Sequence, residues 1–318
     1  NKILDLFGMG AILKADIFDF NLYSDLSLNS LDFDKFNNIF TSISELSKTL
    51  YKENKKNFSK DTKLTFFGNY RENIWNGSIG EREILSAYGV KIFKTNKWSI
   101  KNINKSSLIG FSYGNYKANQ KNRIEDNISR NRLNILLERN HSYPILQKEK
   151  EKSINSYHLY SPTVIQRGIL LNMQKQIDIY KYSDGNFQNM ITFKIGPEFT
   201  LGNFKKRFLD YTKFSIYPKF TYVEGNSPFD FDQAIDNHEI EISLNQQLIG
   251  PILLKINTDY NLDTNSSKYK ELTNLRYEIS WNRRAYNINI YYNDDSKTGG
   301  INFNLHNFNF DGMGSRFK

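Results

Sequence analysis

The stretch ITFKIGPEFTL, residues 191–201, places apolar residues at its odd positions and mostly polar ones at its even positions. A period of two is typical of a β-strand with one apolar and one polar face. The same alternation returns in seven-residue or longer portions of 213–223, 239–248, 252–263, 275–282 and 285–293, and in shorter form at 18–23, 64–70, 88–92, 109–114 and 301–306. The pattern predicts an all-β protein of about 14–18 strands.

Some parts of the chain do not alternate. Residues 31–51 contain apolar side chains at a spacing near 3.6, so this segment is interpreted as a possible helix or a long loop. Residues 119–132 and 147–155 are rich in polar and charged residues and are predicted to be loops.

Two architectures fit the alternating strands, namely a soluble sandwich or barrel and a transmembrane barrel. The alternating segments are longer than the usual ~5–6 residues and match the ~9–11 that a tilted membrane-crossing strand needs. Charged residues interrupt the polar faces in mid-strand, which suits a watery lumen and also the outer face of a sandwich. These candidate lumen-lining residues are Lys194, Glu198, Lys255, Asp259, Arg276 and Glu278.

The lengths of the connections separate the two architectures. Tight turns are expected at 249–251 and 282–284 and a fairly short one at 202–207, whereas longer polar stretches occupy 182–188, 224–238, 263–274 and 294–299. Short periplasmic turns opposite longer extracellular loops are typical of outer-membrane barrels. The prediction is therefore one antiparallel transmembrane β-barrel domain spanning residues 1–318, with the soluble module as the weaker alternative.

Composition excludes several classes of protein. Cysteine is absent, which removes disulfide frameworks and thiolate metal sites, and no apolar run is long enough for a spanning helix. The net charge of +9 suits an anionic partner such as a lipid phosphate, but it also fits a general enrichment in Lys and Asn. We expect no nucleic-acid partner.

Several short motifs follow one another in an order that is similar to one family. They read FLDYTKF (208–214), SPFDFD (227–232), LNQQLIGP (244–251), YNLDT (260–264), RRAY (283–286) and NFNF (307–310), with YREN (70–73) and NGSIG (76–80) further upstream. The combination resembles the C-terminal barrel of cyanobacterial LptD-like (OstA-like) lipopolysaccharide-assembly proteins. The residues that carry the resemblance most clearly are Ser227, Pro228, Phe229, Asp232, Gly250, Pro251 and Tyr286.

The resemblance implies a place and a task. Members of that family lie in the outer membrane of Gram-negative-type bacteria, receive lipopolysaccharide from a periplasmic jellyroll bridge, and release it sideways into the outer leaflet. That route implies a polar lumen and a weak seam between the first and last strands. The partners implied are lipopolysaccharide or another anionic lipid, the surrounding outer-membrane lipids, and a jellyroll supplied by a bridge protein or by an N-terminal domain that we do not expect within residues 1–318.

Candidate chemistry is sparse. The four histidines are scattered, and His306 beside Asn304 is better interpreted as a polar lumen pair than as a catalytic one, so we expect no enzyme, no cofactor and no metal. Three carboxylates within residues 230–237 raise the question of a Ca²⁺ site, but a solvated extracellular loop is the favoured interpretation. The basic pair Arg283 and Arg284 is expected at a periplasmic turn, where it would contact an anionic lipid head or simply keep the turn soluble.

The functional expectation is translocation of lipopolysaccharide or a related lipid by guided passage. The lumen-facing charges would either accompany a polyanion or form a structural lattice of ion pairs. The alternative is a porin-like solute channel or a structural outer-membrane barrel, and a soluble β-rich binding module comes third.

Overall fold

A computed structural model gives the fold of the chain. It describes residues 7–28, 36–100, 103–121, 123–147, 165, 167–202, 206–283 and 286–305. Within this part the elements are β1 (Phe7–Ile17), β2 (Phe20–Leu28), α1 (Phe36–Ile39), β3 (Phe40–Lys55), β4 (Phe58–Trp75), the short 3₁₀ turn η3 (Gly77–Ile79), β5 (Glu81–Ile100), β6 (Ile103–Gln120), β7 (Arg123–Gln147), β8 (Gly168–Tyr182), β9 (Phe187–Leu201), β10 (Thr212–Gly225), β11 (His238–Ile249), β12 (Ile252–Asn261), β13 (Leu272–Asn282), β14 (Tyr286–Asn293) and β15 (Thr298–Leu305).

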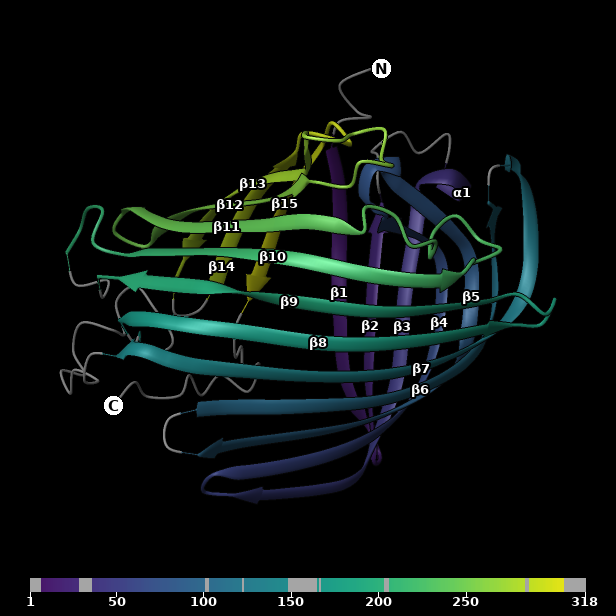
Figure 1. Cartoon of the computed structure of the whole chain (residues 1–318), viewed down its shortest axis with the longest axis horizontal. Helices are drawn as coiled ribbons and strands as arrows, with labels where there is room; N and C mark the ends of the chain where they lie inside the picture. Colours follow the sequence, from purple (N-terminus) through teal and green to yellow (C-terminus); the bar gives the residue numbers. More distant parts are fainter. Residues whose placement is uncertain are drawn as a thin grey trace.

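These strands form one sheet that curves round into a barrel (Figure 1). Each strand pairs in antiparallel fashion with the next strand along the chain, and β15 returns to β1. Hairpin after hairpin is the arrangement that strict alternation favours, because only antiparallel strands can be joined by very short turns. The prediction of an antiparallel β-barrel is confirmed, and the fifteen strands of the described residues fall within the expected range.

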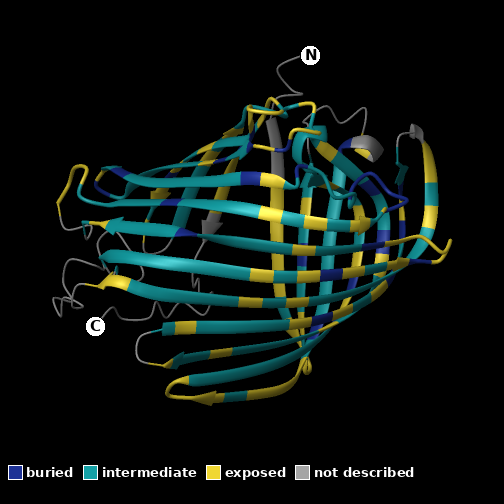
Figure 2. Cartoon of the chain, in the orientation of Figure 1, coloured by how far each residue is buried: buried dark blue, intermediate teal, exposed yellow. Residues whose placement is uncertain are grey.

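The wall of the barrel turns apolar side chains outward. Ile191 on β9 is 53% exposed, Tyr222 on β10 is 68% exposed, and Phe303 on β15 is 58% exposed. The neighbours of Ile191 and Tyr222 along β9 and β10 are less exposed, so exposed and less exposed residues alternate over parts of these strands in Figure 2. No helix in the described part of the chain is long and apolar enough to cross a membrane.

Three local predictions were wrong. In segment 31–51 only Phe36–Ile39 is helical, and Phe40 onward is β3, whose backbone pairs with both β2 and β4; residues 31–35 lie outside the described residues. Segment 119–132 is not a loop, because β6 ends at Gln120 and β7 begins at Arg123, with Asn119 opposite Asn127. Phe18 lies in the β1–β2 turn and is fully exposed.

The loop prediction for residues 119–132 was wrong because it relied on the polar composition of that segment. A ladder of backbone hydrogen bonds between β6 and β7 does not need an apolar face, since the side chains there meet water or other polar groups. Asn115 donates to Asn131 at 2.9 Å and Ser129 donates to Asn115 at 3.0 Å across the two strands. The predicted loop 147–155 begins at the last residue of β7, and the rest of it lies outside the described residues.

Connections are sorted between the two ends of the barrel, although not completely. At the first end, which we call the turn end, most hairpins close within two or three residues, at 18–19, 56–57, 101–102, 250–251 and 283–285. The connections 148–167 and 202–211 are longer exceptions at that end. At the opposite end, which we call the loop end, lie the extended connections 226–237 and 262–271 together with shorter ones at 76–80, 121–122, 183–186 and 294–297.

The seam between β1 and β15 differs from every other strand pair described. The two strands run parallel and share two residue pairs, Phe7 with Gly299 and Gly8 with Gly300. The antiparallel ladder between β13 and β14, by comparison, has seven pairs. Both seam pairs lie at the loop end; beyond them β1 pairs with β2 and β15 with β14, and the two strands diverge in Figure 1. The seam is therefore closed at one end and forms a wedge toward the other.

Candidate functional site

Residues 226–237, which join β10 to β11, form what we call the inner loop. This loop folds back into the mouth of the barrel at the loop end. Phe229 is fully buried and Phe231 is 4% exposed, although both belong to a connection between strands. Their rings lie 5.1 Å apart, and they join a cluster with Phe67, Tyr116 and Tyr182 from the barrel wall. Figure 2 shows buried residues gathered at this end.

A buried ion pair fixes the middle of the inner loop. Arg132 on β7 donates from Nη1 to Oδ2 of Asp232 at 2.8 Å and from Nη2 to the hydroxyl of Tyr116 at 2.9 Å. Its guanidinium also lies 4.0 Å from the ring centre of Tyr116, and the side chains of Arg132 and Asp232 are only 14% and 9% exposed. Tyr182 donates to the same carboxylate at 3.0 Å, and so does the hydroxyl of Ser227. The carboxylate is thus fully engaged.

Two amide side chains of the wall bind the backbone of the inner loop. Gln188 on β9 donates to the carbonyl of Asp232 at 2.8 Å and accepts from the amides of Ser227 and Ala234, each at 3.2 Å. Asn76, in the β4–β5 turn, donates to the carbonyls of Asp230 and Gln233 at 2.7 and 3.0 Å. Backbone groups that would otherwise be buried without partners are satisfied in this way.

The end of the inner loop is held by Asp236. Its carboxylate accepts from the backbone amide of Ser78 and from the side chain of Asn261, the latter at 2.6 Å. The neighbouring Gly77 has a φ of +50°, and a side chain there would overlap the Asp236 carboxylate. The NGSIG turn and the inner loop, far apart in sequence, therefore fit one another through a glycine that has no room for a Cβ.

The acidic residues of the inner loop do not converge on a common point. Asp230 forms an ion pair with Arg82 at 3.3 Å, Asp232 with Arg132, and Asp236 accepts from Ser78 and Asn261. Burial raises the pKa of Asp230, and the guanidinium of Arg82 opposes that shift. No group of three or more potential metal ligands occurs among the described residues. The favoured interpretation of 230–237 as a solvated loop was wrong, because its polar residues find partners inside the barrel.

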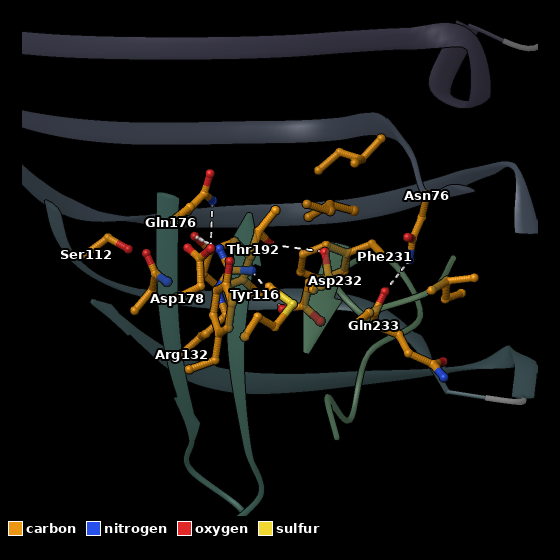
Figure 3. A pocket seen from close by; sticks show the side chains of 18 of the residues that line it. Asn76, Ser112, Tyr116, Arg132, Gln176, Asp178, Thr192, Phe231, Asp232 and Gln233 are labelled. Carbon is orange, nitrogen blue, oxygen red and sulfur yellow. Dashed lines mark hydrogen bonds and ion pairs between the residues drawn. The ribbon is translucent and has the colours of Figure 1, made fainter. Parts of the chain in front are cut away.

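Beneath the inner loop lies a cavity of about 690 Å³ inside the barrel. Its floor and sides come from β4 to β11, and its roof is the inner loop itself, represented by Phe231, Asp232 and Gln233 (Figure 3). Amides and hydroxyls are prominent in the lining; those labelled in the figure are Asn76, Ser112, Gln176, Thr192 and Gln233. Tyr116 and Phe231 add aromatic faces, and their rings stack at 5.8 Å.

Charges around the cavity are paired. Four basic residues line it, and each has a carboxylate partner: Arg132 with Asp232, Lys91 with Glu45 at 2.5 Å, Lys194 with Glu241 at 2.8 Å, and Lys219 with Glu239 at 2.7 Å. Two further carboxylates in the lining, Glu72 and Asp178, accept hydrogen bonds from Asn69 and Gln176. The lining itself holds equal numbers of cations and carboxylates, and the partners of Lys91 and Lys219, Glu45 and Glu239, lie just outside it.

The structure gives each predicted lumen residue a position. Lys194 lines the cavity, whereas the other five lie outside its lining. Glu198 pairs with Lys213 at 3.0 Å, and Lys255 pairs with Glu278 at 2.7 Å. Arg276 lies 3.5 Å from Glu278 and 4.3 Å from the ring centre of Tyr291, and Asp259 accepts from Asn274 at 3.5 Å. Five of the six predicted residues thus form an ion pair with one another or with a near neighbour, and Asp259 accepts a hydrogen bond instead.

The remaining predicted residues lie at the turn end. Arg283 is exposed, with its guanidinium 5.4 Å from the ring centre of Trp281, while Arg284 lies outside the described residues, as does His306. Gly250 has a φ of +50° and its carbonyl accepts from Gln247, and Pro251 accepts from the amide of Asn282. Tyr286 packs edge-on against Trp281 at 5.9 Å. These residues shape two turns.

A comparison with known protein families identifies the family of this chain. A family model described as "Protein of unknown function (DUF3769)" matches residues 1–309. The chain belongs to this family. No curated protein and no solved structure matches it. In this DUF3769 chain, two motifs singled out in the sequence, NGSIG and SPFDFD, contact each other across the mouth of the barrel.

Sequence reasoning missed the wall residues that hold the inner loop. Arg132 was assigned to a loop, and Gln188 lies at the edge of a segment that was also expected to be one. Neither has a local signal, because their partners lie 100 and 44 residues away along the chain. The one available hint was the pair of phenylalanines in SPFDFD, which are unusual in a solvated loop.

Proposed function

We propose that this chain is an outer-membrane barrel that passes lipopolysaccharide or a related lipid from the periplasm to the outer leaflet, as LptD-like proteins do. In this proposal the turn end faces the periplasm and the loop end faces the cell exterior. The acyl chains would leave sideways through the seam while the polar head occupies the lumen. The chain would act by positioning and passage, without bond chemistry.

Insertion into a membrane is supported by the outer face of the barrel. Soluble proteins rarely leave large contiguous apolar areas in water, yet here Ile109, Phe111 and Tyr113 on β6 and Tyr277, Ile279 and Trp281 on β13 are each at least 38% exposed. Outward apolar and inward polar alternation is the pattern of a barrel in lipid. A soluble barrel would bury the apolar face instead.

The observation that carries the proposal is the two-residue parallel seam. A strand edge without a partner leaves backbone N–H and C=O groups unpaired, and proteins normally avoid that in a closed barrel. Parting two residue pairs disrupts far less structure than parting a ladder of seven or more. The seam is therefore the place where this wall opens at the lowest cost.

The inner loop supports lateral release over a porin-like route. A porin needs a passage that is continuous from one mouth to the other. Here the loop-end mouth is crossed by a segment that is anchored by Arg132, Gln188 and Asn76 and packed with buried aromatic rings. A head group that enters the lumen from the turn end meets this closure, so the seam offers the remaining exit.

Locking the seam tests the proposal. The chain has no cysteine, so the double variant Gly8→Cys, Gly300→Cys can be cross-linked by oxidation without interference. We expect the oxidised variant to abolish delivery of newly made lipopolysaccharide to the surface of intact cells, and reduction to restore it. The control is Tyr277→Cys, Tyr292→Cys, which joins the well-paired strands β13 and β14. Normal delivery with a fully cross-linked seam would overturn lateral release, and solute uptake that depends on the chain would then favour the porin-like alternative.

A further inference from the structure

We infer that the cavity beneath the inner loop binds an uncharged, hydroxyl-rich sugar unit and disfavours a phosphate-bearing one. This inference deepens the proposed function, since it names the chemical class of the head group that would occupy the lumen. It rests on the charge balance of the cavity, on unpartnered amide oxygens in its lining, and on its size and aromatic content.

The cations of the cavity are not available as phosphate ligands. Lys91, Lys194 and Lys219 each lie within 2.8 Å of a carboxylate oxygen. Arg132 pairs with Asp232 and donates to Tyr116, so that only its Nε lacks a partner. A phosphate group, which carries a charge of about −1.5 to −2 at neutral pH, would have to displace one of these carboxylates. In a confined site of reduced dielectric, such a displacement leaves the displaced carboxylate unpaired and is costly.

Two more carboxylates make the site repel anions. Glu72 and Asp178 line the cavity and are held by amide groups, Glu72 by Asn69 and Asp178 by Gln176 at 2.7 Å, with no ion-pair partner among the described residues. A neutral ligand carries no charge for them to repel. Their presence therefore separates neutral from anionic head groups even where both would fit the space.

Hydrogen-bond acceptors in the lining match hydroxyl donors. Unpartnered polar atoms of both kinds, donors and acceptors, occur among the buried atoms of the lining residues. Nε of Arg132 and Nδ2 of Asn134 lack an acceptor, and the side-chain oxygens of Asn69 and Asn237 lack a donor within the described structure. A sugar hydroxyl donates as well as accepts, so it would satisfy these oxygens. A phosphate at neutral pH presents mainly acceptor oxygens and would not.

Size and aromatic content agree with this class of ligand. The volume of about 690 Å³ lies within the ~300–1,000 Å³ typical of small-molecule sites. Phe67, Tyr116 and Phe231 form an aromatic wall in which neighbouring rings lie 5.8–6.1 Å apart. Their apolar faces suit the C–H faces of a sugar ring, while the amides around them suit its hydroxyls.

Calorimetry on the full chain in detergent tests the inference with two probes, a neutral hexose trisaccharide and the same trisaccharide carrying one phosphate. We expect the neutral probe to bind at least tenfold more tightly. Asn237→Ala removes a side-chain amide that makes no hydrogen bond within the described structure, so the barrel should fold while affinity for the neutral probe falls about tenfold. Glu72→Gln removes a negative charge from the lining while keeping the size of the side chain, so it should narrow the difference in affinity between the two probes severalfold.

Each other outcome has a definite meaning. Equal or tighter binding of the phosphorylated probe would overturn the inference, and so would the absence of binding by either probe to a chain that still migrates as a folded barrel. If neither probe binds selectively but cross-linking the seam still abolishes lipopolysaccharide delivery, the sugar-site inference is wrong and the proposed lipid passage is retained. If the neutral probe binds selectively but cross-linking the seam has no effect on delivery, the transport proposal is wrong and the sugar-binding inference is retained.

Discussion

At the scale of single residues, the inner loop is held by a few side chains that are largely buried from water. The Arg132–Asp232 pair is the clearest case, because both side chains are largely buried and neither has an alternative charged partner in the contacts described. A buried ion pair adds little compared with apolar packing, but removing one partner leaves an uncompensated charge. The loop should therefore be sensitive to loss of either partner.

Asp232→Ala tests this sensitivity. We expect the substitution to lower the free energy of unfolding by about 3–5 kcal/mol, since the guanidinium of Arg132 stays buried without its carboxylate. Urea titration of the purified barrel, followed by the gel shift between folded and unfolded forms, measures the change. The control is Asp19→Asn, which breaks the exposed pair with Lys48 at 3.1 Å and should cost about 0–1 kcal/mol. Equal effects of the two variants would show that the buried pair is not a principal anchor.

Gly77 gives a second residue-scale prediction. Both Gly77 and Gly80 have positive φ, but only Gly77 faces an atom that a Cβ would strike, the Asp236 carboxylate, while Gly80 has open space. We expect Gly77→Ala to speed hydrogen exchange of the amides in residues 226–237 by at least tenfold. Gly80→Ala carries the backbone strain alone and should leave that exchange nearly unchanged. Similar exchange in both variants would contradict the fit between the two segments.

At the scale of elements, alternation of apolar and polar residues was enough to locate most strands from β4 onward and to predict a barrel. It failed where polar residues occupy both faces, as in the first part of β7, because the backbone ladder there needs no apolar side. It failed again in the inner loop, where the partners of Asp230, Asp232 and Asp236 come from distant strands. Local sequence contains no signal for such distant partners. The sequence therefore pointed to the candidate site only through Lys194 and through residues of the YREN, NGSIG and SPFDFD motifs.

The inner loop also lies across the part of the mouth that is bordered by β4 to β9. Replacing residues 228–235 with a short Gly-Ser turn removes Phe229, Phe231 and Asp232 together and should open a continuous aqueous path. We expect single-channel conductance in planar bilayers to rise severalfold above that of the unaltered barrel. The matched replacement of 264–269 in the β12–β13 connection, which contributes nothing to the cavity lining, should leave conductance unchanged. An unaltered conductance after the first replacement would mean that the barrel is closed elsewhere.

At the scale of the whole molecule, the sorting of connections between the two ends is the basis of the proposed orientation. Absence of cysteine makes this easy to measure with single-cysteine variants. Ser267→Cys lies in the exposed β12–β13 connection at the loop end, and Lys56→Cys lies in the β3–β4 turn at the turn end. A membrane-impermeant maleimide should label the first variant in intact cells and the second only after the outer membrane is permeabilised. The reverse labelling would invert the proposed orientation.

The parallel seam has a consequence for the two termini of the domain. The described part of the chain has an odd number of strands, so β1 begins at the loop end and β15 ends at the turn end. In the proposed orientation, a periplasmic domain joined ahead of β1 would need one more strand to connect it across the membrane. The wedge between β1 and β15 could accommodate that strand, because it would run antiparallel to both of them. The odd strand count therefore distinguishes two possible assemblies. A periplasmic domain joined ahead of β1 would place an extra strand in the wedge, whereas a bridge protein on a separate chain would leave the wedge open for the lipid.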